Sequence, residues 1–145
     1  MSWNSLNALA AEGHTIGSHT GSHRRLSALD DDARVEEIVE SADDLESRIH
    51  RPIRWFAFPF GDVASIDASA LEMIGRRYVY CCSGVAGSND ALTDPLSIFR
   101  ANIDLDLAFS YQLFVLEGGM DLRYRQRAKQ YRSMIATKPQ AGATL

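Results

Sequence analysis

The sequence predicts an α/β fold built on a parallel sheet. Short apolar runs alternate along the chain with longer segments in which apolar residues recur every three or four positions. Buried strands that alternate with amphipathic helices are typical of parallel sheets, because the crossover helices cover such sheets. The 145 residues, 46% of them hydrophobic, match one domain with its own core. About four strands are expected, which is a low number for a closed barrel.

Two helices and one strand are expected in the first third of the chain. Apolar residues at helical spacing in 3–10, followed by a glycine, predict the end of a helix. The segment HTIGSHT, residues 14–20, alternates like a short strand. Residues 35–49 carry the clearest helical pattern, and Ser27 with Asp30 predicts a capping box before it.

The rest of the chain continues the alternation of strands and helices. A helix is expected at 67–77, and a terminal helical region at 109–134. We assign residues 1–135 to the domain and residues 136–145 to a flexible tail. Further strands are expected at 53–61 (IRWFAFPFG), 78–85 (YVYCCSGV) and 95–104 (PLSIFRANID).

Composition and charge exclude several classes of protein. The net charge of −4 argues against general binding of nucleic acid, which needs a basic face. Cys81 and Cys82 are adjacent, and a disulfide between them would close a strained ring, so both are expected to be strand residues. No apolar stretch reaches the roughly 20 residues that a membrane-spanning helix needs.

Three of the four histidines lie within ten positions, at His14, His19 and His23. His19 and His23 are four residues apart, a spacing that can aim both imidazoles at one point. Zinc accepts neutral imidazole, but catalytic zinc sites typically have three protein ligands, so two histidines are an incomplete set. The alternative interpretation is two exposed histidines near a helix start. Gly17 and Gly21 favour the metal site, since they allow close backbone approach.

Two segments carry a resemblance to a known family. GHTIGSHTGSH, residues 13–23, resembles the second motif of the NodB-homology polysaccharide deacetylases, carbohydrate esterase family 4, whose H-[ST]-x-x-H histidines bind the metal. FAFPFG, residues 56–61, is similar to the third motif, in which a strand ends in Pro and an aromatic and forms one wall of the substrate groove. The resemblance extends over residues 6–121 and implies a partial, distorted parallel (β/α) barrel that lacks its first strands.

The resemblance also implies roles for particular residues. His19 and His23 are expected to bind a divalent metal, with zinc as the first choice, and N-acetylated polysaccharide is the expected substrate. The Phe60 backbone N–H is expected to stabilise the oxyanion. His14 is expected to be a structural strand residue, and His50 a surface or C-capping residue. The substrate-binding residues would be Phe58, Pro59, Phe60 and Gly61.

The sequence departs from the family pattern in its carboxylates. The family's first motif supplies an Asp pair, one Asp as general base and one as metal ligand, and no Asp precedes Asp30 here. We therefore expect the first motif to be missing from this sequence. Asp62, Asp104 and Asp106 are candidates to replace it, but carboxylates after strands more often serve as turn or cap residues.

Arginine positions are a second departure. Many members have an Arg two positions before the motif Pro, where this chain has Ala57, and no histidine follows His50 to make the family's late motif. Arg100 on the expected last strand resembles an Arg in a subgroup of bacterial exopolysaccharide and cell-surface deacetylases. It would orient the base or an acyl oxygen, or it would pair with Asp104 or Asp106.

Three hypotheses for the function follow. The first is a metal-dependent hydrolase that removes acetyl groups from N-acetylated or O-acetylated polysaccharide and is inactive or weakly active without the Asp pair. The second is a non-catalytic remnant that binds carbohydrate or a partner protein, and the third is a metal-binding structural module. Without its first strands the sheet would have an exposed edge through which the chain forms a homo-oligomer.

Overall fold

Three short parallel strands form the centre of the molecule. A computed structural model describes residues 1–136, in which the strands β1 (Gly17–Ser18), β2 (Trp55–Ala57) and β3 (Tyr80–Cys82) form one sheet in the order β1-β2-β3. Each pair is parallel, and a single parallel bridge from Cys82 to Ile98 continues the sheet beyond β3. The predicted alternation of parallel strands and helices is confirmed.

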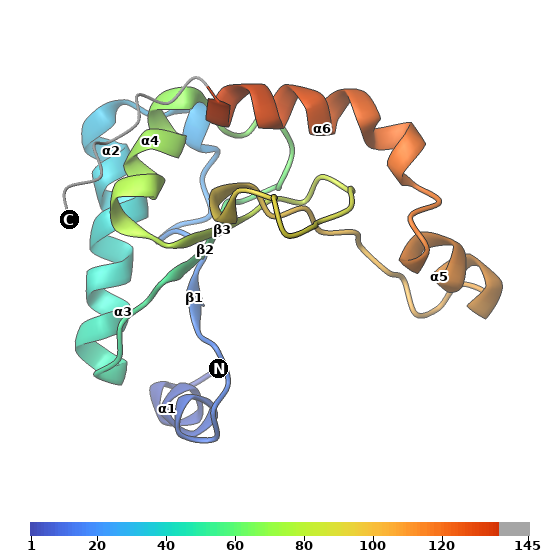
Figure 1. The fold of residues 1–145 in the computed structure, drawn as a ribbon. Helices are drawn as coiled ribbons and strands as arrows, with labels where there is room; N and C mark the ends of the chain where they lie inside the picture. The colour runs from blue at the N-terminus through green and yellow to red at the C-terminus, as the bar shows by residue number, and fades with distance from the viewer. Residues whose placement is uncertain (137–145) are drawn as a thin grey trace.

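The helices in the connections between the strands lie together on one side of them, whereas the first helix lies apart below β1 (Figure 1). The segment 31–49 is helical throughout, with a π-helical turn, η2, at Glu36–Glu40. The α-helices are α1 (Trp3–Ala11), α2 (Asp31–Val35), α3 (Ser41–Ile49), α4 (Ala68–Arg77), α5 (Phe109–Leu116) and α6 (Asp121–Ala136), and the 3₁₀ turns are η1 (Leu26–Ala28) and η3 (Pro95–Ser97).

The two faces of the sheet differ in burial. Ser18, Phe56 and Cys81 are register neighbours and are buried against the helices. Trp55 and Tyr80 project to the opposite face, where their rings stack at 4.1 Å and remain partly exposed. Successive strand residues face opposite sides, so the core lies on one face of the sheet and the other face is open.

The start of the long helical segment differs from the predicted capping box. Asp30 is the N-cap, and its carboxylate accepts a hydrogen bond from the Ala33 N–H at 2.9 Å. Ser27 lies in η1 and donates to the carbonyl of Ala64 instead. The capping-box prediction is wrong because Ser27 is part of η1 and lies before the N-cap of the helix. At the other end, His50 is the left-handed C-cap of α3, as expected.

The last expected strand is the largest error in the prediction of secondary structure. Residues 95–104 were expected to be extended, but Pro95 begins η3 and the Asp94 carboxylate accepts from the Leu96 N–H at 2.8 Å. Only Ile98 pairs with β3, because the residues before it form η3, where the Ser97 N–H donates to the Asp94 carbonyl and not to the sheet. Ala136, the first residue of the predicted tail, instead ends α6, and the rest of the predicted tail lies outside the described residues.

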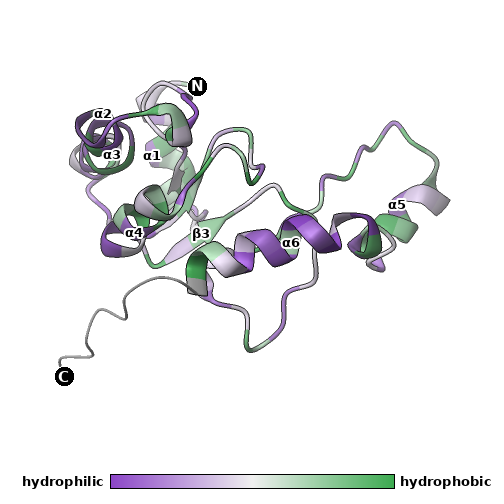
Figure 2. Cartoon of the chain, turned by 90° about the horizontal axis from the view of Figure 1, so that it is seen from above, coloured by the Kyte–Doolittle hydropathy of each residue, from purple (hydrophilic) through white to green (hydrophobic). Residues whose placement is uncertain are grey.

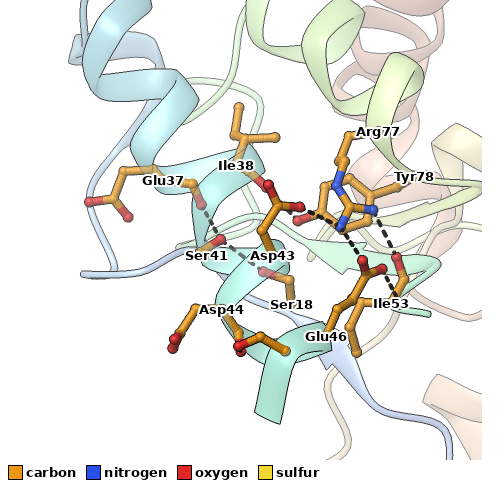
Figure 3. A network of polar contacts seen from close by, with 11 residues as sticks. Ser18, Glu37, Ile38, Ser41, Asp43, Asp44, Glu46, Ile53, Arg77 and Tyr78 are labelled. Atoms are coloured by element: carbon orange, nitrogen blue, oxygen red, sulfur yellow. Dashed lines mark hydrogen bonds and ion pairs between the residues drawn. The ribbon is translucent and has the colours of Figure 1, made fainter. Parts of the chain in front are cut away.

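A polar network fixes α3 to the sheet (Figure 3). Arg77, at the end of α4, pairs with Asp43 and Glu46 of α3 at 3.0 Å each. Glu46 also accepts the backbone N–H of Ile53 at 2.7 Å, just before β2. These contacts hold the helix in a fixed position beside β1 and β2.

None of the helices within residues 1–136 is long and apolar enough to cross a membrane.

Candidate metal and substrate site

The two motif histidines lie together at the carboxyl end of β1. His19 directly follows the strand, and the ring centroids of His19 and His23 are 5.0 Å apart at an interplanar angle of 67°. Two imidazoles bound to one zinc ion at about 2.0–2.1 Å in a tetrahedral arrangement have centroids roughly 5 Å apart. The observed spacing therefore fits a shared ion.

His19 is oriented by the neighbouring strand. Its Nδ1 lies 2.6 Å from the backbone carbonyl oxygen of Ala57, the last residue of β2. A carbonyl only accepts hydrogen bonds, so Nδ1 carries the proton and a neutral His19 has its lone pair on Nε2. Metal-binding histidines typically donate their second ring N–H in this way. Ala57 thus contributes through its backbone, although its side chain replaces the expected Arg.

Unusual backbone conformations concentrate at this site. In the described residues four non-glycine residues have positive φ, and three of them are Thr20 (68°), His23 (60°) and Phe60 (64°). The N–H of His23 donates to the Thr20 hydroxyl at 3.0 Å, which closes the turn between the histidines. Left-handed non-glycine residues are sparse in proteins and cluster at functional sites.

A buried carboxylate that sequence reasoning missed contacts the same turn. Glu37 of the π-helical turn is only 5% exposed and accepts hydrogen bonds from the backbone N–H groups of Gly21 and Ser22. Burial raises the pKa of Glu37, but the hydrogen bonds from Ser22 and Gly21 outweigh burial and lower the pKa below 4.5. No signal in the sequence singles out Glu37, because a Glu in an amphipathic helix is normally assigned to the solvent face.

Of the four expected substrate-binding residues, only Phe60 presents its side chain to solvent. Its ring is 56% exposed and lies 5.1 Å from the ring of His23. Phe58 is 1% exposed and packs against Tyr131, and Pro59 is also fully buried. Both side chains belong to the core, so the assignment of Phe58 and Pro59 as substrate-binding residues stays a prediction that would depend on their backbone atoms.

Gly61 has a conformational role in the turn after β2. Its φ is +67°, and a Cβ at this position would lie 2.6 Å from the backbone N and Cα of Gly84. The N–H of Gly84 donates to the Gly61 carbonyl at 2.9 Å. This close contact fixes the turn that carries Phe60 beside the histidines. Above the Phe60 ring, the Arg25 guanidinium lies 4.7 Å from the centroid and pairs with Asp62 at 3.2 Å.

Arg100 and His19 line one cavity of about 490 Å³ on the open face of the sheet. Arg100 donates from Nε to the carbonyl of Ser83 at 2.8 Å. No carboxylate of residues 1–136 lies within ion-pair distance of Arg100, so the expected pairing with Asp104 or Asp106 is absent from that part of the chain. Cys82 also lines the cavity, and burial raises its pKa against the opposing effect of Arg100, so it is a thiol at neutral pH.

The described residues do not complete a three-ligand metal site. Within residues 1–136 no three His, Cys, Asp or Glu side chains are close enough to hold one ion. Asp62 is paired with Arg25, and Asp104 accepts from the Asp106 N–H at 3.0 Å, as expected of a turn residue. His14 precedes β1 and is exposed, 3.9 Å from Glu12, so its assignment as a structural strand residue is wrong.

Solved structures show the same fold. A Streptococcus pyogenes deacetylase in complex with acetate superposes with a TM-score of 0.70 at 19% identity, over 81% of this chain and 50% of that chain. A Bacillus cereus polysaccharide deacetylase gives a TM-score of 0.62 at 18% identity, over 93% of this chain and 36% of that chain. The chain thus spans half or less of the length of these structures. Its fold is the expected partial parallel (β/α) barrel.

The family follows from the sequence match. The family model for polysaccharide deacetylase matches residues 1–79, which include β1, the histidine pair and β2. The chain belongs to the polysaccharide deacetylase family. A search of curated proteins gave no match.

Proposed function

We propose that this chain is part of a metal-dependent hydrolase that removes acetyl groups from N-acetylated or O-acetylated polysaccharide. The observation that carries the proposal is the hydrogen bond from His19 Nδ1 to the Ala57 carbonyl at 2.6 Å, combined with the 5.0 Å spacing of the His19 and His23 rings. The first directs the Nε2 lone pair away from β2, and the second allows one ion to meet both rings.

The donor set suits zinc. Neutral imidazoles are preferred zinc ligands, and the hydrogen bond of His19 fixes its ring orientation and tautomer. A bound divalent cation would polarise an acetyl carbonyl and increase the acidity of water at the site. His19 and His23 supply two ligands of the usual three, so we infer that the third ligand and the general base come from residues outside the described part of the family domain.

Phe60 and Arg100 are proposed to act on the acetyl group. Phe60 is held in a left-handed conformation beside His23, and its backbone N–H would donate to the acetyl oxygen when it becomes the oxyanion. The exposed Phe60 ring offers an apolar surface to a sugar. Arg100 uses Nε to bind Ser83, and its other guanidinium donors remain for an acyl oxygen or for the carboxylate of the base.

Acetate release from an N-acetylated oligosaccharide tests this function. The assay compares residues 1–145 with a version extended upstream to the length of the solved deacetylases, each with added zinc. We expect activity only in the extended protein, abolished by His19→Ala, because residues 1–136 contain no complete ligand set. Activity in residues 1–145 alone would show that a carboxylate such as Asp62 acts as the base.

The exposed apolar side chains of α5 favour a second candidate function, the binding of a partner protein or of a second copy. Figure 2 shows α5 as a largely hydrophobic helix that stands apart from the sheet, with Phe109 70% and Leu116 65% exposed. Large exposed apolar side chains in a contiguous region are typical of interaction sites. We infer that these surfaces become buried in a complete domain or in a homo-oligomer.

A further inference from the structure

We propose that Glu37 is a positioning residue of the metal site, which holds the turn between His19 and His23 in the conformation that brings the two rings together. This inference rests on the proposed function of the histidine pair. Glu37 lies on the helix that follows the motif, 14 positions after His23 in the sequence.

The carboxylate of Glu37 binds the turn through both oxygens. One oxygen accepts from the N–H of Gly21 at 2.9 Å and from the N–H of Ser22 at 2.8 Å. The other accepts from the Ser22 hydroxyl. Hydrogen bonds to a charged acceptor are about twice as strong as neutral ones, and Glu37 is 5% exposed, so water competes little for them. Both bonded residues lie between the two histidines.

The same residue also connects to the strand before His19. The Glu37 carbonyl oxygen accepts from the Ser41 hydroxyl at 2.7 Å, and this hydroxyl lies 3.2 Å from the hydroxyl of Ser18, the last residue of β1. Figure 3 shows the Glu37 side chain directed away from Ser41, so the backbone and the carboxylate of Glu37 serve different segments. The π-helical turn at Glu36–Glu40 carries this residue, and such turns are frequent at functional sites.

The turn needs such support because its backbone is strained. Thr20 and His23 both have left-handed φ values, which are unfavourable for an ordinary L-residue. Without the carboxylate, the N–H groups of Gly21 and Ser22 lose the acceptor that the structure gives them, and the turn can relax to other conformations. The ring of His23 would then leave its position beside His19, while the core of the domain stays intact.

The test uses full-length variants with a matched control. Glu37→Ala removes the carboxylate, and Glu37→Gln keeps an oxygen acceptor without the charge. Glu40→Gln is the control, because Glu40 is an exposed Glu of the same π-helical turn. Affinity for Zn²⁺ is measured by competition with a chromogenic chelator. Amide proton shifts of Gly21 and Ser22, and ring shifts of both histidines, are measured by NMR without metal.

We expect Glu37→Ala to weaken Zn²⁺ binding by about 10- to 100-fold, the usual effect of losing a residue that orients ligands. Glu37→Gln should restore part of the affinity, and Glu40→Gln should change it less than about twofold. Without metal, only the Glu37 variants should move the amide shifts of Gly21 and Ser22 and the ring shifts of His23. If Glu37→Ala does not fold, the contrast between Glu37→Gln and Glu40→Gln decides in the same way.

Two results separate this inference from the proposed function. Unchanged amide and ring shifts in a folded Glu37→Ala or Glu37→Gln variant would overturn the positioning role, whatever the metal affinity. Equal Zn²⁺ affinity of the wild-type chain and a His19→Ala variant would overturn the proposed metal site. In that case the NMR shifts still decide whether Glu37 positions the turn.

Discussion

Substitution of Gly61 by Ala tests the geometry of the turn that follows β2. The left-handed φ of +67° costs an Ala about 1–2 kcal/mol. The new Cβ would also lie 2.6 Å from the N and Cα of Gly84, and forced overpacking costs about 1–3 kcal/mol. Moving these backbones apart breaks the 2.9 Å hydrogen bond from Gly84 to Gly61, worth about 0.5–1.5 kcal/mol. We therefore expect a loss of about 2.5–6.5 kcal/mol in the free energy of unfolding.

Gly13→Ala is the matched control for this experiment. Gly13 also has a positive φ, +93°, but an added Cβ would meet nothing within 4 Å. Only the conformational cost of about 1–2 kcal/mol remains there. Urea denaturation followed by circular dichroism gives both values. If Gly61→Ala destabilises the protein no more than Gly13→Ala does, the inferred contact between Gly61 and Gly84 is wrong.

Three further predictions concern other parts of the molecule. Glu37 has a lowered pKa when folded, so its contribution to stability is present above pH 4.5 and is lost as the pH falls through the lowered pKa. The difference in unfolding free energy between wild type and Glu37→Gln should therefore shrink in acid, and a constant difference from pH 7 to 3 would refute this. In urea denaturation, Phe58→Ala should lower the free energy of unfolding by about 3–5 kcal/mol and Phe60→Ala by less than about 1 kcal/mol, since Phe58 is 1% and Phe60 56% exposed. Equal losses would contradict the assignment of Phe58 to the core. The apparent mass in sedimentation should rise with protein concentration, and the double variant Phe109→Ser, Leu116→Ser should lower it. A wild-type chain that stays monomeric at all concentrations would contradict the inferred self-association.

The sequence predicted the order of the elements better than their lengths. Alternating apolar runs located all three strands, but β1 has two residues and β2 three, because the pattern does not show where pairing stops. The apolar pattern of 35–49 begins at Val35, yet Val35 is 38% exposed and Arg34 is buried instead. The π-helical turn adds one residue to the helical repeat, so the residues before it are shifted relative to the apolar stripe of the residues after it.

The candidate site was predictable only in part. The four-residue spacing of His19 and His23 indicated a common point, and their rings do lie together. The hydrogen bond from His19 to the Ala57 carbonyl was not predictable, since a backbone acceptor leaves no mark on residue identity. Glu37 was missed for a different reason: a polar residue in an amphipathic helix is normally assigned to solvent, and only the fold shows that this one is buried.

The most direct test of the central claim is the affinity of the chain for Zn²⁺ after removal of single histidines. His19→Ala and His23→Ala each remove one proposed ligand, and His14→Ala removes an exposed imidazole that lies outside the pair. We expect each of the first two variants to bind Zn²⁺ at least about tenfold more weakly than the wild type, with one ion per chain in the wild type and no change in His14→Ala. Equal affinities in all four proteins would contradict the assignment of His19 and His23 as metal ligands.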